Sequence, residues 1–431
     1  MIGVLGGGIT GLTFAHLVKD SEVLEGDSTF GGLCRSIYDR GYTFDLGSHI
    51  VFSRNKEVLD FQLDLLGNNK IKHKRNTKVL YGGKLVKYPF ENGLGDLEKQ
   101  EAFDCLADYV DTYIEREKGS LAKPQNFKEW MYYRFGKSIC DKYLYPYNAK
   151  IWDYNLSKMA LFWVEGRIPQ PPTRDVIKAA MDMESEGYTH QLYFYYPSKG
   201  GFQALSDSLV SKIEKERLHS SFKIEKIKKE NDKWVVKSNS GQEKIYNKIV
   251  NTFHIQDFFR TLEDVPQDVQ EAVDNLKWNS AYLTMIGVNK KLNDFHWMYL
   301  PDKEILPNRI SFPSNMSPHN VPKGKSSILS ETTFSPKGEK SKLGKDKVNE
   351  TVVEQMGKAL GFSDDEVDYS KTIVGKYVYV VYDLDYEKNI QKIYDYVKEI
   401  DVTLAGRFAE FRYYNSDKCV ESAMEKAKLF S

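Results

Sequence analysis

The first residues that suggest chemistry form a glycine-rich turn near the N-terminus. Residues 6–11 (GGGITG) follow an apolar run at 2–5 and open a stretch, 12–18, that we expect to be helical. In this order Gly6 makes a tight turn, Gly8 lets backbone N–H groups approach a pyrophosphate, and Gly11 allows close packing of helix on strand. The pattern predicts a dinucleotide-binding βαβ unit. Its predicted contacts are Gly6, Gly8, Ile9, Thr10 and Gly11.

An acidic residue completes this unit. Glu25 ends a second expected strand at residues 21–25. A carboxylate there would accept hydrogen bonds from an adenosine ribose, and it disfavours the 2′-phosphate of NADP.

Three further segments indicate FAD rather than NAD. Residues 31–36 (GGLCRS) resemble the glycine doublet of the flavin amine oxidase superfamily, where a second turn and Arg35 approach the phosphates. Residues 42–49 (YTFDLGSH) resemble the segment along the isoalloxazine ring, and residues 406–410 (GRFAE) resemble the closing flavin contact. The predicted cofactor contacts from these segments, together with one position in a later β-rich piece, are Gly31, Gly32, Leu33, Arg35, Gly47, Ser48, His49, Ile224, Gly406 and Arg407.

Two arginines stand out by their context. Arg167 ends the run LFWVEGR before a proline-rich stretch, and Arg309 begins the run RISFPSN. A lone arginine is more often a surface or salt-bridge residue. Two arginines that converge on a flavin from different domains would form a fork for a diphosphate or a carboxylate.

Several motifs make the resemblance more specific. Residues 87–92 (KYPFEN), 146–152 (PYNAKIW), 163–167 (WVEGR), 297–301 (WMYLP), 308–309 (NR), 314–318 (SNMSP) and 412–413 (RY) resemble the UDP-galactopyranose mutase family over nearly the whole chain. The resemblance implies interconversion of UDP-galactopyranose and UDP-galactofuranose, an isomerase reaction that would supply galactofuranose for cell-surface glycans. Reduced flavin N5 would attack the sugar anomeric carbon, and NAD(P)H or another donor would reduce the flavin.

The resemblance also implies roles for individual residues. Arg167 and Arg309 would hold the diphosphate, and Tyr379 and Tyr413 would donate phenol hydrogen bonds to it. Tyr299 would stack on uracil with Tyr88 beside it, while Asn148 and Trp152 would help hold the UDP moiety. His49 would lie beside the flavin and affect its redox state. The expected catalytic residues are therefore His49, Arg167 and Arg309.

The sequence departs from the family pattern in three places. Glu91 replaces a glutamine, which puts a carboxyl group near the expected uracil edge. The segment from Tyr379 to Tyr382 reads YVVY where the family has a YPVP-type motif, and the segment after Arg412 is shorter than in the eukaryotic type.

Composition excludes several other classes. Lysine plus arginine and aspartate plus glutamate each number 61, so no net charge draws the chain to nucleic acid or an anionic membrane. Cys34, Cys105, Cys140 and Cys419 show no metal-ligand spacing, and we expect reduced thiols and no metal. The chain has no apolar run long enough to span a membrane and no signal-peptide pattern, so we expect a cytoplasmic protein; its oligomeric state stays open, with a homo-oligomer as one option.

The order of expected elements positions these residues. A predominantly helical region is expected over about 58–183, with an apolar stripe at Phe127, Trp130, Met131, Phe135 and Ile139. Strands are expected at 222–229, 234–237, 248–251, 281–288 and 327–333, a solvated lysine-rich loop at 337–347, and two helices around Gly406.

This order predicts an α/β fold with mixed α+β insertions, in which a discontinuous Rossmann-type FAD-binding domain carries a helical domain and a mostly antiparallel β substrate domain. The expected divisions are 1–90, 196–260 and 391–431 for the FAD-binding parts, 91–195 for the helical domain and 261–390 for the β domain.

Two other functions compete with the mutase. One is an FAD-dependent oxidoreductase of the amine oxidase or protoporphyrinogen oxidase type, in which the two arginines would be structural or bind carboxylates. The other is a flavin-containing binding protein without turnover, which no residue favours.

Overall fold

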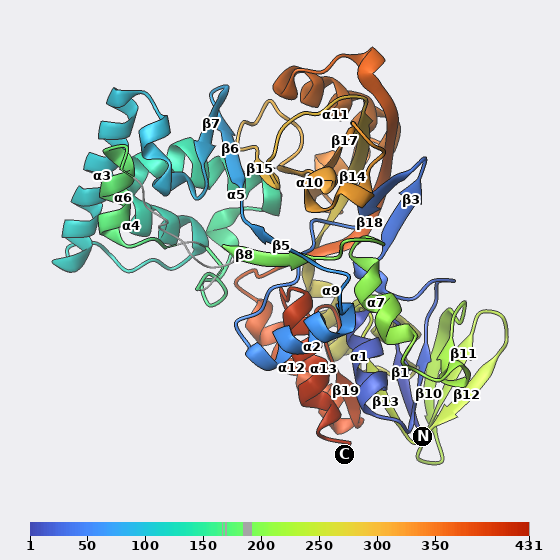
Figure 1. Cartoon of the computed structure of the whole chain (residues 1–431). Helices are drawn as coiled ribbons and strands as arrows, with labels where there is room; N and C mark the ends of the chain where they lie inside the picture. The colour runs from blue at the N-terminus through green and yellow to red at the C-terminus, as the bar shows by residue number, and fades with distance from the viewer. Residues whose placement is uncertain (166, 169, 184–191, 431) are drawn as a thin grey trace.

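A parallel five-stranded sheet forms the base of the molecule in the computed structural model, which describes residues 1–165, 167–168, 170–183 and 192–430. The strands lie in the order β19 (Val402–Leu404), β13 (Lys248–Asn251), β1 (Ile2–Leu5), β2 (Ser21–Leu24) and β9 (Leu218–His219). All four pairings are parallel. Strands from both ends and the middle of the chain thus build one discontinuous Rossmann-type sheet, as predicted (Figure 1).

Helices and a small second sheet cover the parallel sheet. The helices are α1 (Ile9–Leu17), α2 (Lys56–Leu66), α7 (Gln203–Val210), α8 (Ile255–Thr261), α9 (Gln267–Asn275), α12 (Tyr386–Glu399) and α13 (Ser416–Ala427). The small antiparallel sheet contains β10 (Ile224–Glu230), β11 (Lys233–Ser238) and β12 (Glu243–Tyr246). It packs closely on β1, because a Cβ atom on Gly3 would lie only 2.4 Å from the ring of Tyr246.

A mostly antiparallel seven-stranded sheet lies above the parallel sheet in Figure 1. Its strands, in order, are β18 (Val367–Val381), β14 (Lys277–Val288), β17 (Ser326–Phe334), β16 (Arg309–Ser311), β15 (Trp297–Tyr299), β6 (Thr77–Tyr81) and β7 (Lys84–Lys87). Only β15 and β6 pair in parallel. The helix α11 (Lys345–Leu360) packs on this sheet, and the short helix α10 (Pro313–Met316) contacts β17.

A helical region lies beside the seven-stranded sheet (Figure 1). It contains α3 (Lys99–Glu117), α4 (Phe127–Ile139), a π-helical turn (Cys140–Leu144), α5 (Tyr145–Trp152) and α6 (Thr173–Ala180). The apolar stripe predicted for α4 is confirmed, since Phe127, Met131, Phe135 and Ile139 are buried and Trp130 is half-buried against the same core. Two short ribbons, β3 (Ser36–Asp39) with β4 (Tyr42–Asp45) and β5 (Ile71–Lys74) with β8 (Tyr193–Tyr196), complete the fold.

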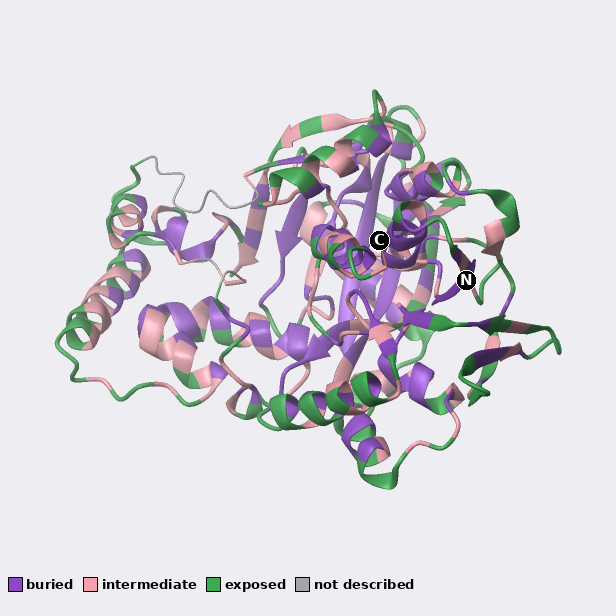
Figure 2. Cartoon of the chain, turned by 90° about the horizontal axis from the view of Figure 1, so that it is seen from below, coloured by how far each residue is buried: buried purple, intermediate pink, exposed green. Residues whose placement is uncertain are grey.

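The cores lie between these layers. The strands of both large sheets are mainly buried, and exposed residues concentrate on the outer helices and loops (Figure 2). In the part of the chain that the structure describes, no helix combines the length and the apolar composition that a membrane crossing requires.

Three expectations about elements are wrong. Residues 71–87 hold β5, β6 and β7 within the region expected to be predominantly helical, and β6 and β7 belong to the seven-stranded sheet. Residues 345–360 form α11 within the stretch expected to hold only strands and loops, and residues 402–404 form a strand before Gly406. For β5, β19 and α11, pairing or packing with a distant segment decides the local structure. The predicted division into domains stays a prediction.

Candidate active site

One large cavity joins the parallel sheet, the helical region and the seven-stranded sheet. Its volume is about 1250 Å³, and residues from Gly6 to Cys419 line it. Pockets for a single drug-sized ligand usually measure roughly 300–1,000 Å³. The cavity is therefore large enough for a dinucleotide and a second ligand together.

Two glycine turns form one end of this cavity. A Cβ atom on Gly11 would lie 2.0 Å from the carbonyl oxygen of Gly6, so only glycine lets α1 start this close to β1. The second turn docks on the first, because Gly31 donates its N–H to the carbonyl of Gly7 at 2.8 Å. A Cβ atom on Gly32 would lie 3.1 Å from the Cα of Gly8. Backbone alone thus faces the cavity here, which suits a pyrophosphate at the start of a helix.

Glu25 lies beside these turns with both carboxylate oxygens occupied. It accepts 2.8 Å hydrogen bonds from the N–H groups of Gly7 and Asp27. Burial raises the pKa of Glu25, and these two N–H groups oppose that shift. Asp27 also pairs with Arg35 at 2.8 Å, and Arg35 donates Nε–H to the carbonyl of Gly32 at 3.0 Å. The two turns, Glu25 and Arg35 form one connected network.

Most of the predicted cofactor contacts line the cavity. These are Gly6, Gly8, Ile9, Thr10, Glu25, Gly31, Gly32, Leu33, Arg35, Gly47, Ser48, His49 and Arg407. Gly11, Ile224 and Gly406 do not line it. Gly11 and Gly406 pack behind residues that line the cavity: a Cβ atom on Gly406 would lie 2.3 Å from Oγ1 of Thr10. Ile224 is half-buried in β10, away from the lining.

His49 lies against the ring of Phe202, with centroids 5.1 Å apart and planes at 27°. Burial lowers the pKa of His49 to about 4, and the nearby carboxylate of Glu331 only partly opposes this. The imidazole is therefore neutral at pH 7. Its Nδ1 is buried and has no hydrogen-bond partner among the described residues, so it is available to a bound group.

Arg309 is held by a carboxylate that the sequence did not single out. Its Nη2 donates to both Oε1 and Oε2 of Glu331 at 2.7 Å. Glu331 is only 2% exposed and also accepts a 2.9 Å hydrogen bond from Ser48. Burial opposes the charge on Arg309, but Glu331 and the neighbouring tyrosines together outweigh it and raise the pKa of Arg309 well above its ordinary value.

Tyrosines connect Arg309 to Arg167. Arg309 lies 3.5 Å from the hydroxyl of Tyr379, whose ring contacts Tyr413 edge-on at 5.3 Å. The guanidinium of Arg167 lies 4.1 Å from the centroid of Tyr413, and Arg407 lies 4.7 Å from the same ring. The structure thus brings together Arg167, Arg309, Tyr379 and Tyr413, the four residues expected to bind a diphosphate. We call Arg167 and Arg309 the clamp.

Tyr88 and Tyr299 stack directly on each other, with centroids 4.6 Å apart and planes at 28°. No planar base fits between rings this close, so a base would stack on an outer face or displace one ring. Arg75 lies 5.0 Å from the Tyr88 ring and donates to the Tyr299 hydroxyl at 3.3 Å.

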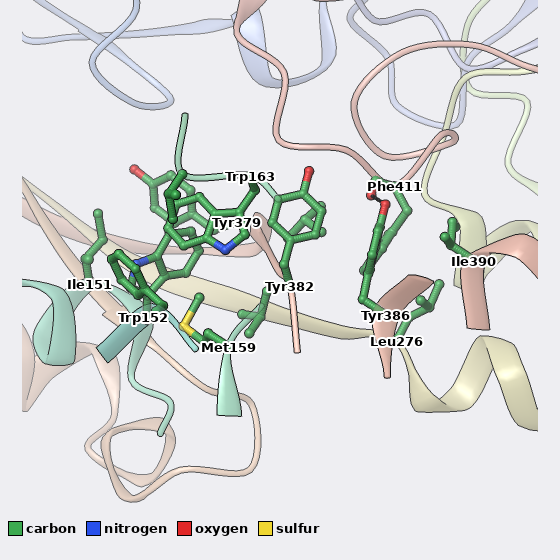
Figure 3. Close-up of a cluster of buried hydrophobic side chains, with 14 of the residues drawn as sticks. Ile151, Trp152, Met159, Trp163, Leu276, Tyr379, Tyr382, Tyr386, Ile390 and Phe411 are labelled. Atoms are coloured by element: carbon green, nitrogen blue, oxygen red, sulfur yellow. Dashed lines mark hydrogen bonds between the residues drawn. The ribbon is translucent and has the colours of Figure 1, made fainter. Parts of the chain in front are cut away.

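The side chain of Asn148 is used within the protein. It donates to the carbonyl of Leu144 at 2.8 Å and accepts from the Trp152 indole at 3.2 Å. Trp152 in turn contacts Trp163 and Tyr379 edge-on at 5.0 and 6.1 Å. Figure 3 shows these rings beside Tyr382 as one aromatic group. Asn148 and Trp152 therefore shape the wall of the cavity, and Asn148 acts through Trp152.

Sequence reasoning missed Glu331 and Arg75. Glu331 is the one charged residue in β17, a strand whose nine residues are all buried. Only Ile328, Leu329 and Phe334 are apolar in this strand, so its sequence does not mark Glu331 as one member of a buried ion pair. Arg75 carried no signal either, because only the fold brings it to Tyr88 and Tyr299.

Among the described residues, no group of three or more histidine, cysteine, aspartate or glutamate side chains could hold a metal ion. The four cysteines are free and buried, and burial raises the pKa of Cys34 and Cys419 beside the cavity.

The parallel sheet with its two glycine turns, at one end of a cavity built by two further regions, defines a nucleotide-cofactor enzyme of the doubly wound class. The family model described as "Flavin containing amine oxidoreductase" matches residues 9–398. The match covers most of the chain, and the protein belongs to this family. The family fits the site, since the backbone cradle suits a pyrophosphate and unpartnered polar atoms of His49 and Arg407 line the same cavity.

Solved structures show the same fold. A reduced UDP-galactopyranose mutase superimposes with a TM-score of 0.90 at 23% identity, covering 99% of this chain and 93% of that one. A putative protoporphyrinogen oxidase from Exiguobacterium sp. 255-15 gives 0.76 at 16% identity, covering 99% and 98%. A fatty acid isomerase from P. acnes gives 0.67 at 15% identity, covering 100% and 98%.

Proposed function

We propose that this protein is an FAD-dependent mutase that interconverts UDP-galactopyranose and UDP-galactofuranose. The observation that carries the proposal is the clamp of Arg167 and Arg309. The two arginines come from different regions of the chain and line the same cavity, joined through Tyr413 and Tyr379.

The charge of this part of the cavity favours an anion. Arg75, Arg167, Arg309 and Arg407 line it, and Glu331 is the carboxylate that contacts one of them. A guanidinium binds the diphosphate of a nucleotide sugar through charge-assisted hydrogen bonds, whereas the same cations repel a protonated amine. The arrangement supports a diphosphate ligand over an amine substrate.

The residues of the clamp would act on the leaving group. Departure of UDP from the anomeric carbon puts negative charge on the diphosphate, which Arg167 and Arg309 would stabilise and retain in place. The hydroxyls of Tyr379 and Tyr413 would add hydrogen bonds to the same oxygens. Glu331 would fix the orientation of Arg309, because it binds Nη2 alone, while Nε has no hydrogen-bond partner among the described residues.

FAD would occupy the end of the cavity with the glycine turns, between Glu25 and His49. When reduced, it would supply the nucleophile for the anomeric carbon, with NAD(P)H or another donor as reductant. Neutral His49 would hydrogen-bond the ring system without adding charge. The resemblance of the motifs and the fold match to a solved mutase support this assignment.

The competing function is an oxidase, because the family includes amine oxidoreductases and a solved protoporphyrinogen oxidase shares the fold. Two anaerobic assays on one preparation separate the functions. In the first, UDP-galactofuranose is incubated with dithionite-reduced protein and the nucleotide sugars are resolved by chromatography. In the second, amines and a porphyrinogen are tested for reduction of the oxidised flavin. Conversion to UDP-galactopyranose without flavin reduction by those substrates supports the mutase, and the reverse pattern contradicts it.

A further inference from the structure

Glu91 is a buried carboxyl group that lines the ligand cavity, and one of its two oxygens has no partner among the described residues. It lies in the short 3₁₀ turn Phe90–Asn92, is only 1% exposed, and lines the cavity. Its Oε2 makes no hydrogen bond to any described residue. A buried polar atom in this situation costs free energy unless a ligand or water satisfies it. Its place therefore points to a bound group.

The surroundings of Glu91 suit a flat ring. The neighbouring Phe90 stacks on Tyr143 at 5.1 Å, and Tyr143 stacks on Tyr147 at 5.5 Å. Tyr147 in turn contacts Tyr299 edge-on at 5.2 Å. Tyrosine faces of this kind stack on nucleobases, and a carboxyl at their edge would meet the hydrogen-bonding edge of the base.

The ionisable groups around Glu91 leave its charge uncompensated. Burial raises the pKa of Glu91 to about 8, and only its own backbone N–H opposes the shift. Cys140 and Tyr143 face it from the π-helical turn, and burial raises the pKa of both. The other charged groups on the described elements packed against it are exposed or half-buried: Lys84, Lys87, Asp96, Asp141, Lys142, Arg174, Asp175 and Lys178. At pH 7 the carboxyl therefore keeps its proton.

We propose that Glu91, as a protonated carboxyl, reads the base of the nucleotide by donating to a ring carbonyl and accepting from the adjacent ring N–H. A protonated carboxyl offers one donor and one acceptor side by side, which matches the O4 and N3–H of uracil. The ionised form has two acceptors and would repel the carbonyl oxygen. This inference rests on the proposed function, because it identifies how that nucleotide substrate is recognised.

The proposal predicts that the affinity for uridine nucleotides falls when Glu91 ionises. The test measures the dissociation constant of UDP by calorimetry, with flavin-loaded wild type and Glu91→Gln between pH 6.5 and 9.0. Glutamine keeps a donor and an acceptor but cannot ionise. We expect roughly tenfold weaker binding to wild type at pH 9.0 than at pH 6.5 and a much smaller change in the variant. Ionisation of the uracil ring itself acts equally on both proteins.

A second variant removes the hydrogen bonds without changing the volume greatly. Glu91→Met is expected to bind UDP about tenfold more weakly than wild type at pH 6.5, while flavin content and unfolding temperature report on its integrity. Parallel pH profiles for wild type and Glu91→Gln, with normal UDP affinity for Glu91→Met, would overturn this inference and leave the mutase proposal standing. Failure of all three flavin-loaded proteins to bind UDP would instead overturn the mutase proposal, and this inference with it.

Discussion

Arg309 and Glu331 lie directly opposite each other on the paired strands β16 and β17, and one guanidinium nitrogen lies 2.7 Å from both carboxylate oxygens. The pair fixes an arginine at the wall of the cavity, yet it also places a buried negative charge next to a proposed anion site. The carboxylate holds Ser48 as well, so the pair connects the substrate end of the cavity to the segment that precedes His49.

Replacing this carboxylate tests the importance of the pair. Glu331→Gln is expected to lower the free energy of unfolding by roughly 3 kcal/mol, because it leaves the half-buried Arg309 charge without its counter-ion. Urea denaturation of the flavin-loaded protein measures the change. The exposed Glu339→Gln is the control, since its surface pair with Lys342 contributes little. A loss below about 0.5 kcal/mol for Glu331→Gln would contradict a structural role for the pair.

Arg167 offers the cleaner test of the clamp, because it is half-exposed and its removal leaves no buried charge behind. Arg167→Ala is expected to lower kcat/KM for UDP-galactofuranose by roughly 100-fold, the effect of losing charge-assisted hydrogen bonds worth about 3 kcal/mol. Flavin content should stay at the wild-type level. Arg174→Ala, an exposed arginine on α6, serves as the control. A colourless Arg167→Ala protein would show that this arginine serves the cofactor or the fold.

A substitution at Gly11 tests whether the two glycine turns form a cradle for the cofactor pyrophosphate. In Gly11→Ala the new Cβ would lie 2.0 Å from the Gly6 carbonyl, so α1 must move away from the turn. We expect purified protein with less than about one-tenth of the wild-type flavin, since a displacement of this kind removes the N–H groups from the pyrophosphate. Gly26→Ala is a matched control, because its Cβ would meet no atom closer than 3.7 Å. Full flavin occupancy in Gly11→Ala would contradict the cradle.

The lowered pKa of His49 predicts how the free energy of unfolding depends on pH. The unfolded chain takes up a proton at His49 as the pH falls below about 6.5, whereas the folded protein resists until about pH 4. The stability that depends on neutral His49 is therefore complete above pH 6.5 and is lost as the pH falls to 4. His49→Gln should lose roughly 2–3 kcal/mol less than wild type between pH 7.5 and 4.5. Equal losses in urea melts of wild type and His49→Gln, with His319→Gln as exposed control, would contradict a neutral imidazole at His49 in the folded protein.

Local patterns in the sequence were enough for the parts of the fold that depend on neighbouring residues. The turn at Gly6, the acid at Glu25 and the helical stripe from Phe127 to Ile139 all lie within short windows, and the structure confirms the strand, turn and helix that they predict. The strands β6 and β7 could also have been recognised, because Gly82 and Gly83 mark a two-residue hairpin turn between them.

Long-range relations were harder to predict. The strand Val402–Leu404 forms because β13, far earlier in the chain, offers it an edge. The partner of Arg309 is Glu331 because β16 and β17 pair in one register, and no spacing in the sequence gives that register. The direct stacking of Tyr88 on Tyr299 likewise depends on the parallel pairing of β6 with β15.

The central claim is that this flavoprotein acts on a nucleotide sugar through its reduced cofactor. The most direct measurement follows UDP-galactofuranose by chromatography in one sample that is oxidised, then reduced with dithionite under argon, then reoxidised with air. The account predicts conversion to UDP-galactopyranose only in the reduced interval, with many turnovers per flavin and no net consumption of reductant. Equal conversion in all three intervals, or none in a sample whose flavin is fully reduced, would contradict it.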